Sequence, residues 1–314
     1  MSRLALVGLG LLLALPLVIE APYYTDTASQ ILIAAVFAAS LNLLVGYGGL
    51  VSLGHAAYLG TAAYLTAYLS VTVGLGHGTA IVLALLATAA MAAVFGLLAL
   101  RASGIGFLMI TLALGQTLWG VAYRWVGVTG GDNGIVGVTR PAPFGLDLSA
   151  PKPFYACVLI GFLIAMAAIA AFVRSGLGAS LMGSRDQPRR MRMLGHNVWL
   201  VQWISFVLAG FWAAVAGIGF VYYHAFVSPH VLALTNSAEV LLMVIAGGAG
   251  TLLGPLVGAA LVVILKNVVS AYVVRWMMLL GLVFLAIVVF MPEGLAPGAR
   301  ALLGRLRARP TARE

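Results

Sequence analysis

Charged and imidazole side chains are rare inside the long apolar stretches of this 314-residue sequence. The three that occur there are His55, Glu239 and Lys266. Such a group is costly to bury, so each is expected to face a cavity or to have a polar partner. Glu239 either lies near a helix N-terminus, where the helix dipole favours a carboxylate, or forms a polar wall of a solute pathway. Lys266 either pairs with Glu239 or extends its long side chain toward a membrane interface.

His55 follows Gly54 in a glycine-rich segment and has several tyrosines nearby. It either contacts a solute or holds an irregular backbone in place through a hydrogen bond. The residues expected to line a substrate pathway are Tyr47, His55, Tyr58 and Glu239.

Signatures of enzymes and metal sites are missing from the sequence. It contains no HExxH zinc motif, no GxSxG motif with triad partners and no GxxxxGK[ST] phosphate loop. His224 and His230 have no third close ligand, and Cys157 is the only cysteine, which excludes an intramolecular disulfide. We therefore expect no catalytic residue, no metal and no cofactor bound by this chain, and no ATP hydrolysis by it alone.

The composition is that of a polytopic membrane protein. Apolar residues make up 63% and charged residues 8% of the chain, with a mean hydropathy of +1.10, whereas soluble domains have about 25% charged residues. This excludes a soluble globular enzyme, a disordered chain and a disulfide-stapled secreted domain. A span needs about 20 apolar residues, and the runs are continuous rather than alternating, which favours helices over a β-barrel.

The predicted fold is all-α, with about ten transmembrane helices and interrupted segments. The expected spans are residues 4–19, 28–45, 56–73, 79–100, 104–123, 154–173, 198–222, 237–248, 255–274 and 276–291. The first of them imitates a signal peptide, but no small-x-small cleavage site precedes Glu20, so we interpret it as a helix. The expected organisation is a transmembrane domain over 1–295 and a basic cytoplasmic tail over 296–314.

Basic residues lie mostly in the connections that this span count assigns to the cytoplasm, which places both termini there. Arg124, Arg140, Lys152 and Arg275 are the bases assigned outside. The twelve assigned inside are Arg3, Arg101, Arg174, Arg185, Arg189, Arg190, Arg192, Arg300, Arg305, Arg307, Arg309 and Arg313. Topology and anionic lipid explain the net charge of +9, so no nucleic-acid partner is expected.

Two glycine-rich segments, 46–60 and 247–260, interrupt the apolar pattern. They share a loose GG-x-x-(Ser/Thr)-Leu motif at 48–53 and 247–252. Either they are broken helices that line a cavity, or they allow tight helix packing. Both fall on the cytoplasmic side of the span count, which argues against a simple inverted repeat. The glycines expected to break the helices are Gly46, Gly48, Gly49, Gly54, Gly247, Gly248, Gly250 and Gly254.

The largest cytoplasmic connection, residues 174–197, reads RSGLGASLMGSRDQPRRMRMLGHN. Pro188 is suited to a helix start and Gly195 to a helix end. A short amphipathic helix with Met191 and Leu194 on its apolar side would fit a groove on a cytoplasmic protein. The alternative is that its arginines anchor the loop to the lipid surface.

Four segments in order resemble one family. They are SLNLLVGYGGLVSLGHAAYLGTAAYL at 40–65, VTGGDNGIVGV at 128–138, SAEVLLMVIAGGAGTLLGPLVGAAL at 237–261 and MPEGL at 291–295. These segments are similar to those of the LivM-type permeases of branched-chain amino acid ABC importers. The resemblance covers nearly the whole chain.

The resemblance implies a permease subunit in the bacterial cytoplasmic (inner) membrane. Its implied partners are a second permease in a heterodimer, two cytoplasmic ATPase subunits that use the ATP, an external solute-binding protein and membrane lipid. Loop 174–197 matches the position of a helix that couples to the ATPase, and the residues implied there are Arg185, Asp186, Arg189, Arg190, Leu194 and Gly195. The chain departs from the family at Arg190 and Met191, where a small-residue pair is usual.

Import by ATP-driven alternating access is the implied mechanism. Similar permeases are associated with leucine, isoleucine and valine, but also with urea, amides, other amino acids and aromatic acids. Unwound backbone in the glycine-rich segments would meet a zwitterionic solute without fixed protein charges. The alternative function is an ion-coupled secondary transporter, for which Glu239 and Lys266 are the available charged residues.

Overall fold

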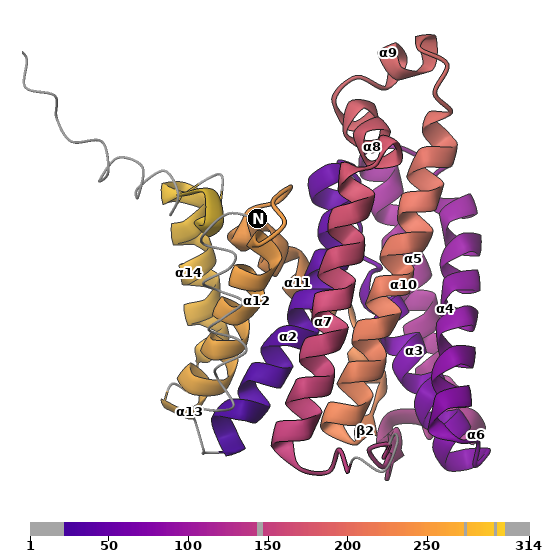
Figure 1. Cartoon of the computed structure of the whole chain (residues 1–314), viewed down its shortest axis with the longest axis vertical. Coiled ribbons are helices and arrows are strands. Elements are labelled where there is room, and N and C mark those ends of the chain that lie inside the picture. The colour runs from indigo at the N-terminus through magenta and orange to yellow at the C-terminus, as the bar shows by residue number, and fades with distance from the viewer. Residues whose placement is uncertain (1–21, 143–146, 273–274, 292–293, 299–314) are drawn as a thin grey trace, which may run out of the picture.

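The structure is a computed structural model that describes residues 22–142, 147–272, 275–291 and 294–298. It is a helical bundle, which confirms the predicted all-α membrane fold (Figure 1). The predicted span 4–19 and most of the predicted tail 296–314 lie outside the described residues.

Helices lie at the positions of all nine predicted spans within the described part of the chain. Five are long and apolar enough to cross a membrane: α2 with its π-helical end (Pro22–Tyr47), α4 (His77–Ala99), α5 (Ile105–Arg124), α7 (Pro151–Arg174) and α10 (Val198–His224). Shorter helices occupy the other positions: α3 (Ala56–Ala67), α11 (Leu234–Gly247), α12 (Gly254–Ile264), α13 (Ser270–Tyr272) and α14 (Trp276–Phe290).

Three of these helices depart from regular α geometry at one end. A π-helical turn continues α2 over Leu43–Tyr47, α3 over Tyr68–Thr72 and α12 over Leu265–Val269. The π-helix is rare and often marks a functional site.

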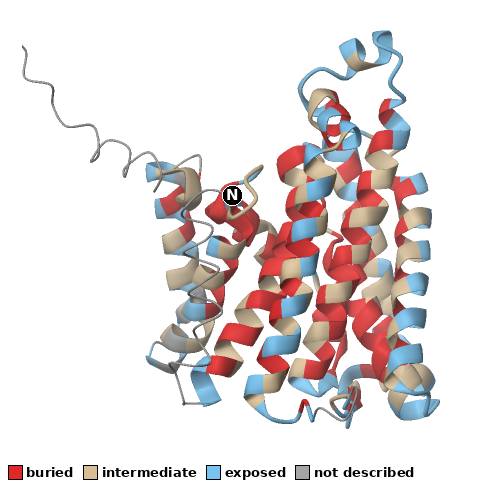
Figure 2. Ribbon diagram, viewed as in Figure 1, coloured by how far each residue is buried: buried red, intermediate tan, exposed pale blue. Residues whose placement is uncertain are grey.

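Helix packing in the bundle depends on small residues. The buried residues of α4 are Ala80, Ala84, Thr88, Ala92, Gly96 and Ala99, which follow one another at helical spacing. This stripe lets α4 approach the central helix α10 closely, while its larger side chains face outward. Buried residues accordingly concentrate along the inner helices (Figure 2).

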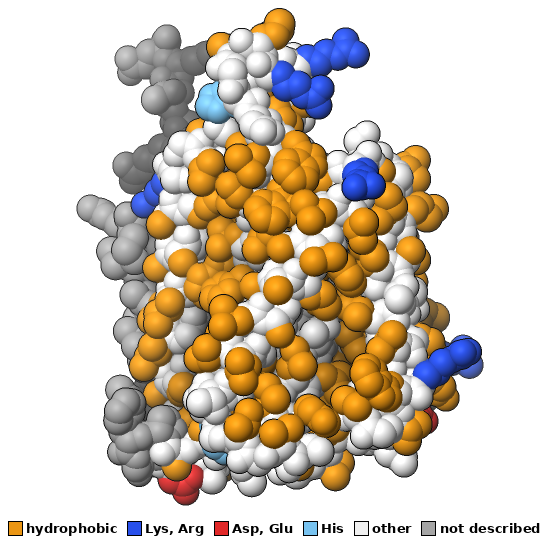
Figure 3. All heavy atoms as spheres, turned by 90° about the vertical axis from the view of Figure 1, so that its right-hand side faces the viewer, with side chains coloured by type: hydrophobic (Ala, Val, Ile, Leu, Met, Phe, Trp, Pro, Cys, Tyr) orange, Lys and Arg blue, Asp and Glu red, His pale blue; other side chains and the backbone are white. Residues whose placement is uncertain are grey.

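The outer face carries a broad apolar surface. In the view from the α4 and α5 side, hydrophobic side chains cover most of the bundle, and Lys and Arg lie toward its two ends (Figure 3). One end carries α8 (Gly176–Asp186) and α9 (Pro188–Met193), and we call it the α8–α9 end.

The opposite end carries α6 (Val126–Thr129) and a two-stranded antiparallel ribbon. In the ribbon β1 (Ile135–Val136) pairs with β2 (Phe226–Val227), with Ile135 opposite Val227. The glycine-rich segment 128–138 makes this pairing possible, because a Cβ atom on Gly134 would clash with the carbonyl of Val227. We call this the ribbon end.

Candidate functional site

The two glycine-rich interruptions contact each other, although they are about 200 residues apart in sequence. At the end of α2, the Asn42 side chain donates to the carbonyl of Thr251 (2.9 Å) and accepts from the backbone N–H of Gly250 (2.8 Å). A Cβ atom on Gly46 would clash with the backbone of Gly250, so only glycine allows this approach. The interruptions therefore form one unit, which we call the double break.

Glycines have two different structural roles within the double break. Gly49, Gly248 and Gly250 have φ angles of 67°, 113° and 78°, a left-handed region that favours glycine. Gly46 instead provides room for another backbone. The segments are thus broken helices that are also tightly packed.

Arg185, at the end of α8, reaches into the double break. Its Nη1 donates to the carbonyl oxygen of Gly46 at 2.6 Å, and its Nε contacts Asp186 at 3.0 Å. A Cβ atom on Gly49 would lie 2.6 Å from the Arg185 side chain, so glycine makes room for it. The Gly46 carbonyl belongs to the π-helical turn, so a charged hydrogen bond joins α8 to the interrupted helix.

Residues 174–197 form two helices, whereas the sequence predicts one. Pro188 begins α9, and Gly195 follows its end with a φ angle of 86°, as predicted. Met191 packs against Gly183 of α8 rather than beside Leu194 on an outer face. Met193 and Leu194 are instead the exposed apolar pair, with exposed fractions of 82% and 68%. Arg189, Arg190 and Arg192 are also exposed.

The first interruption leads into α3, whose N-terminal end meets that of α11. The backbone N–H of Ala56 donates to the Ser237 hydroxyl at 3.0 Å. Gly54 packs against α5, since a Cβ atom there would clash with the carbonyl of Thr111. Positive ends of two helix dipoles therefore lie close together inside the bundle.

His55 is fully buried, and its Nε2 lies 2.8 Å from the Ser40 hydroxyl. The ring stacks on Phe37 and meets Tyr58 edge-on. Of the two roles considered for His55, these contacts favour holding the irregular backbone. Tyr47 and Tyr58 are buried as well, with exposed fractions of 7% and 3%.

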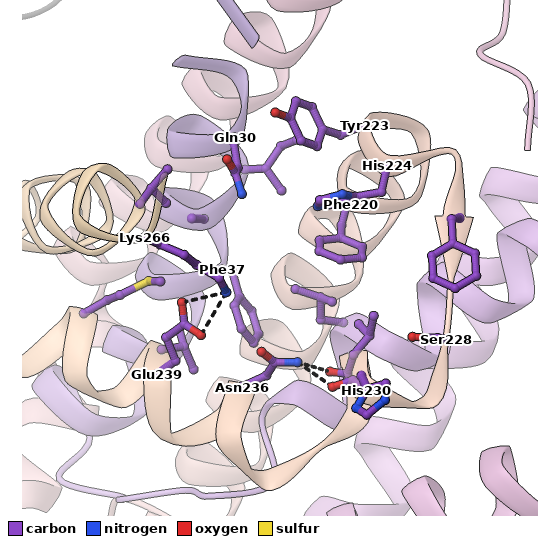
Figure 4. A pocket seen from close by; sticks show the side chains of 18 residues that line it. Gln30, Phe37, Phe220, Tyr223, His224, Ser228, His230, Asn236, Glu239 and Lys266 are labelled. Atoms are coloured by element: carbon purple, nitrogen blue, oxygen red, sulfur yellow. Dashed lines mark hydrogen bonds and ion pairs between the residues drawn. The ribbon is translucent and has the colours of Figure 1, made fainter. Parts of the chain in front are cut away.

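A cavity of about 340 Å³ lies among α2, α10, α11 and α12 (Figure 4). Its polar lining includes Gln30, Asn236, Glu239 and Lys266. Its apolar lining includes Ile33, Phe37, Leu59, Val240, Met243 and Val263. Among the four residues predicted to line a pathway, the structure places Glu239 on this cavity, whereas Tyr47, His55 and Tyr58 are packed elsewhere.

Glu239 and Lys266 form the ion pair that the sequence raised as one alternative. Lys266 Nζ lies 3.3 Å from each carboxylate oxygen. Glu239 is in the second turn of α11 rather than at its N-terminus, and Lys266 belongs to the π-helical turn of α12. The neighbouring Asn267 donates to Gln30 of α2 at 2.7 Å, which fixes this turn beside the cavity.

Sequence reasoning missed Asn42, Gln30 and Asn267. Each is an amide side chain within an apolar run, where an unpaired polar group would be costly. The presence of an amide side chain within an apolar run was the sequence signal that could have identified these residues. Their partners lie on other helices, so the sequence alone could not identify the contacts.

Long apolar helices, paired interruptions and an internal cavity with a charged pair define a multi-pass membrane transport protein. The chain belongs to the family described as the permease component of the branched-chain amino acid transport system, which it matches over residues 23–288. The resemblance drawn from the four sequence segments is thereby confirmed.

Two relatives share most of the chain. The high-affinity branched-chain amino acid transport system permease protein LivM of Salmonella typhimurium is 27% identical over 301 residues, which cover 88% of this chain and 71% of the relative. The LivM protein of Escherichia coli is 26% identical with the same coverage. No solved structure matches the chain.

Proposed function

We propose that this chain is the permease subunit of an ATP-driven importer that moves branched-chain amino acids, or a related small polar solute, by alternating access. The names of its relatives supply the substrate class. The observation that carries the mechanism is the hydrogen bond from Arg185 to Gly46, with Asn42 extending the connection to Gly250.

The α8–α9 end is the proposed docking surface for the cytoplasmic ATPase, of which the transporter has two subunits. Met193 and Leu194 are exposed there beside Arg189, Arg190 and Arg192. An apolar pair ringed by bases suits a groove with acidic edges. This surface faces the cytoplasm, consistent with the positive-inside rule, and the protein resides in the bacterial inner membrane.

Movement of α8 would be transmitted to the double break directly, through the hydrogen bond from Arg185 to Gly46. Hydrogen bonds to charged groups contribute about 1.5–3 kcal/mol, so Arg185 links the position of α8 to the conformation of the π-helical turn. A solute with different affinity for the two conformations would then be released on one side. A second permease and an external binding protein complete the proposed transporter.

Ion-coupled secondary transport is the other candidate, favoured by the partly exposed Glu239–Lys266 pair in the cavity. The two functions differ in the partners and energy source that the chain needs for transport. An importer requires ATPase subunits, whereas a secondary transporter takes up solute alone under an ion gradient.

Purification in mild detergent from the native membrane tests the proposal. We expect two ATPase subunits and a second permease to copurify, and leucine uptake by the reconstituted complex to require internal ATP and the binding protein. Recovery of the chain alone, with uptake driven by a proton or sodium gradient, would contradict the proposal and support the second candidate.

A further inference from the structure

We infer that the cavity among α2, α10, α11 and α12 binds an amino acid by exchange with the Glu239–Lys266 ion pair. The ligand carboxylate pairs with Lys266, its ammonium pairs with Glu239, and its aliphatic side chain contacts the apolar wall of the cavity. This inference rests on the proposed function for the direction of transport and deepens it by assigning a binding site in the permease itself.

Charge is the first argument for a zwitterionic ligand. Glu239 and Lys266 have side chains that are 22% and 41% exposed, so both remain accessible from the cavity. Their two contacts of 3.3 Å are longer than the roughly 2.7–2.9 Å of a strong charged hydrogen bond. A ligand with one carboxylate and one ammonium would replace this contact with two shorter ones and leave neither protein charge unpaired.

The shape and lining of the cavity are the second argument. A volume of about 340 Å³ is at the small end of the roughly 300–1,000 Å³ typical of ligand pockets. The wall contains Ile33, Phe37, Leu59, Val240, Met243 and Val263. This wall suits an aliphatic side chain and offers no fixed charge for an acidic or basic one.

The backbone around Lys266 is the third, independent argument. Lys266 lies in a π-helical turn, a geometry often found at functional sites. Asn267 fastens that turn to Gln30, which also lines the cavity. The lysine is therefore held on the cavity wall rather than extended to the end of the bundle.

A metal ion does not suit the same residues. Among the described residues, Glu239 is the only carboxylate on the cavity, and no group of three or more metal-binding side chains occurs. A phosphatidylethanolamine headgroup shares the ammonium-and-anion chemistry of an amino acid, so the test must separate these two sources.

Site-specific cysteine protection provides that test. The chain has one cysteine, Cys157, so Cys157→Ser gives a background in which Ala34→Cys places a thiol on the cavity wall. The complete complex is placed in nanodiscs of phosphatidylcholine and phosphatidylglycerol, and labelling by a methanethiosulfonate reagent is timed with and without leucine. Val126→Cys, at an exposed position outside the cavity, is the matched control.

We expect leucine to slow labelling of Cys at position 34 and to leave the control unchanged. Glu239→Gln and Lys266→Gln should each weaken this protection about tenfold or more, because each removes one charged contact. Glu239→Asp and Lys266→Arg should retain it, and so should Asp147→Asn, which removes an exposed carboxylate that does not line the cavity. 4-Methylpentanoate and 3-methylbutylamine, which each carry one charge, should protect poorly.

Several results would overturn the inference. Absence of leucine protection at both position 34 and a second, partly exposed lining position, Phe220→Cys, in a complex that imports leucine would leave the proposed function intact and exclude the proposed binding site. Equal protection by the single-charge analogues, or protection by phosphatidylethanolamine instead of leucine, would exclude amino acid exchange. A complex that imports no leucine with ATP would instead contradict the proposed function.

Discussion

The side-chain oxygen of Asn42 lies 2.8 Å from the backbone nitrogen of Gly250 and accepts its hydrogen, across 208 positions of sequence. The same amide donates to Thr251. One side chain at the end of α2 thus satisfies two backbone groups of the second interruption. Non-helical backbone inside a membrane protein needs such partners, and the end of α2 provides them for the second interruption.

Replacing Asn42 with alanine is expected to destabilise the double break. The N–H of Gly250 and the carbonyl of Thr251 would each lose a partner, at a cost of about 1–3 kcal/mol per unsatisfied group. Thermal unfolding in detergent measures the effect. Asn197→Ala is the control, because it removes one exposed helix cap, worth about 1 kcal/mol. Equal loss of stability in the two variants would show that Asn42 does not stabilise the double break through its contacts with Gly250 and Thr251.

A methyl group at Gly46 is expected to separate the two interruptions. The added Cβ would clash with Gly250 and with the Asn42 side chain, and overpacking of this kind costs about 1–3 kcal/mol. Gly120→Ala is the matched change, since a Cβ atom there has nothing within 4 Å and alanine favours a helix by about 1 kcal/mol. Normal transport and a normal unfolding temperature in Gly46→Ala would contradict the close contact between Gly46 and Gly250.

Much of the fold could be predicted because lipid imposes a simple rule on the sequence. Continuous apolar runs predicted the position of every transmembrane helix in the described part of the chain. Pro188 and Gly195 marked the limits of α9 for local reasons that need no tertiary contact. The separate helix α8 was not predicted, because its Gly- and Ser-rich sequence resembles a loop.

The site was less predictable, since its contacts join distant segments. Glu239 and Lys266 stood out because charges are rare in apolar runs, and their pairing could be offered as an alternative. His55 stood out for the same reason, but its Ser40 contact favours a packing role. Arg185 was expected at an ATPase surface, and nothing in the sequence indicated its contact with Gly46.

Substitutions of His55 and Glu239 are expected to impair different properties of the protein, stability in the first case and the KM for leucine in the second. His55→Ala removes a buried ring that packs on Phe37 and bonds Ser40, so unfolding temperature and yield should fall, while folded protein keeps its KM for leucine. Glu239→Gln should fold normally and raise the KM about tenfold or more, as loss of a charged contact predicts. The opposite pattern would place the pathway at His55.

The exposed tip of α9 is expected to bind the ATPase. Leu194→Ser should reduce the copurifying ATPase about fivefold or more, as at an interface hot spot, and leave the unfolding temperature unchanged because Leu194 is 68% exposed. Val136→Ser on β1, 65% exposed at the ribbon end, serves as the control. Undiminished copurification with Leu194→Ser would move the docking surface elsewhere.

The most direct test of the proposed coupling is the amount of leucine imported per ATP hydrolysed by the reconstituted complex. Arg185→Ala removes the hydrogen bond from α8 to Gly46, whereas Arg124→Ala removes an exposed arginine from the end of α5, at the ribbon end. We predict that Arg185→Ala keeps its ATPase subunits and hydrolyses ATP with import reduced about tenfold or more, and that Arg124→Ala keeps the normal ratio. An unchanged ratio in Arg185→Ala would contradict the claim that Arg185 couples α8 to the double break.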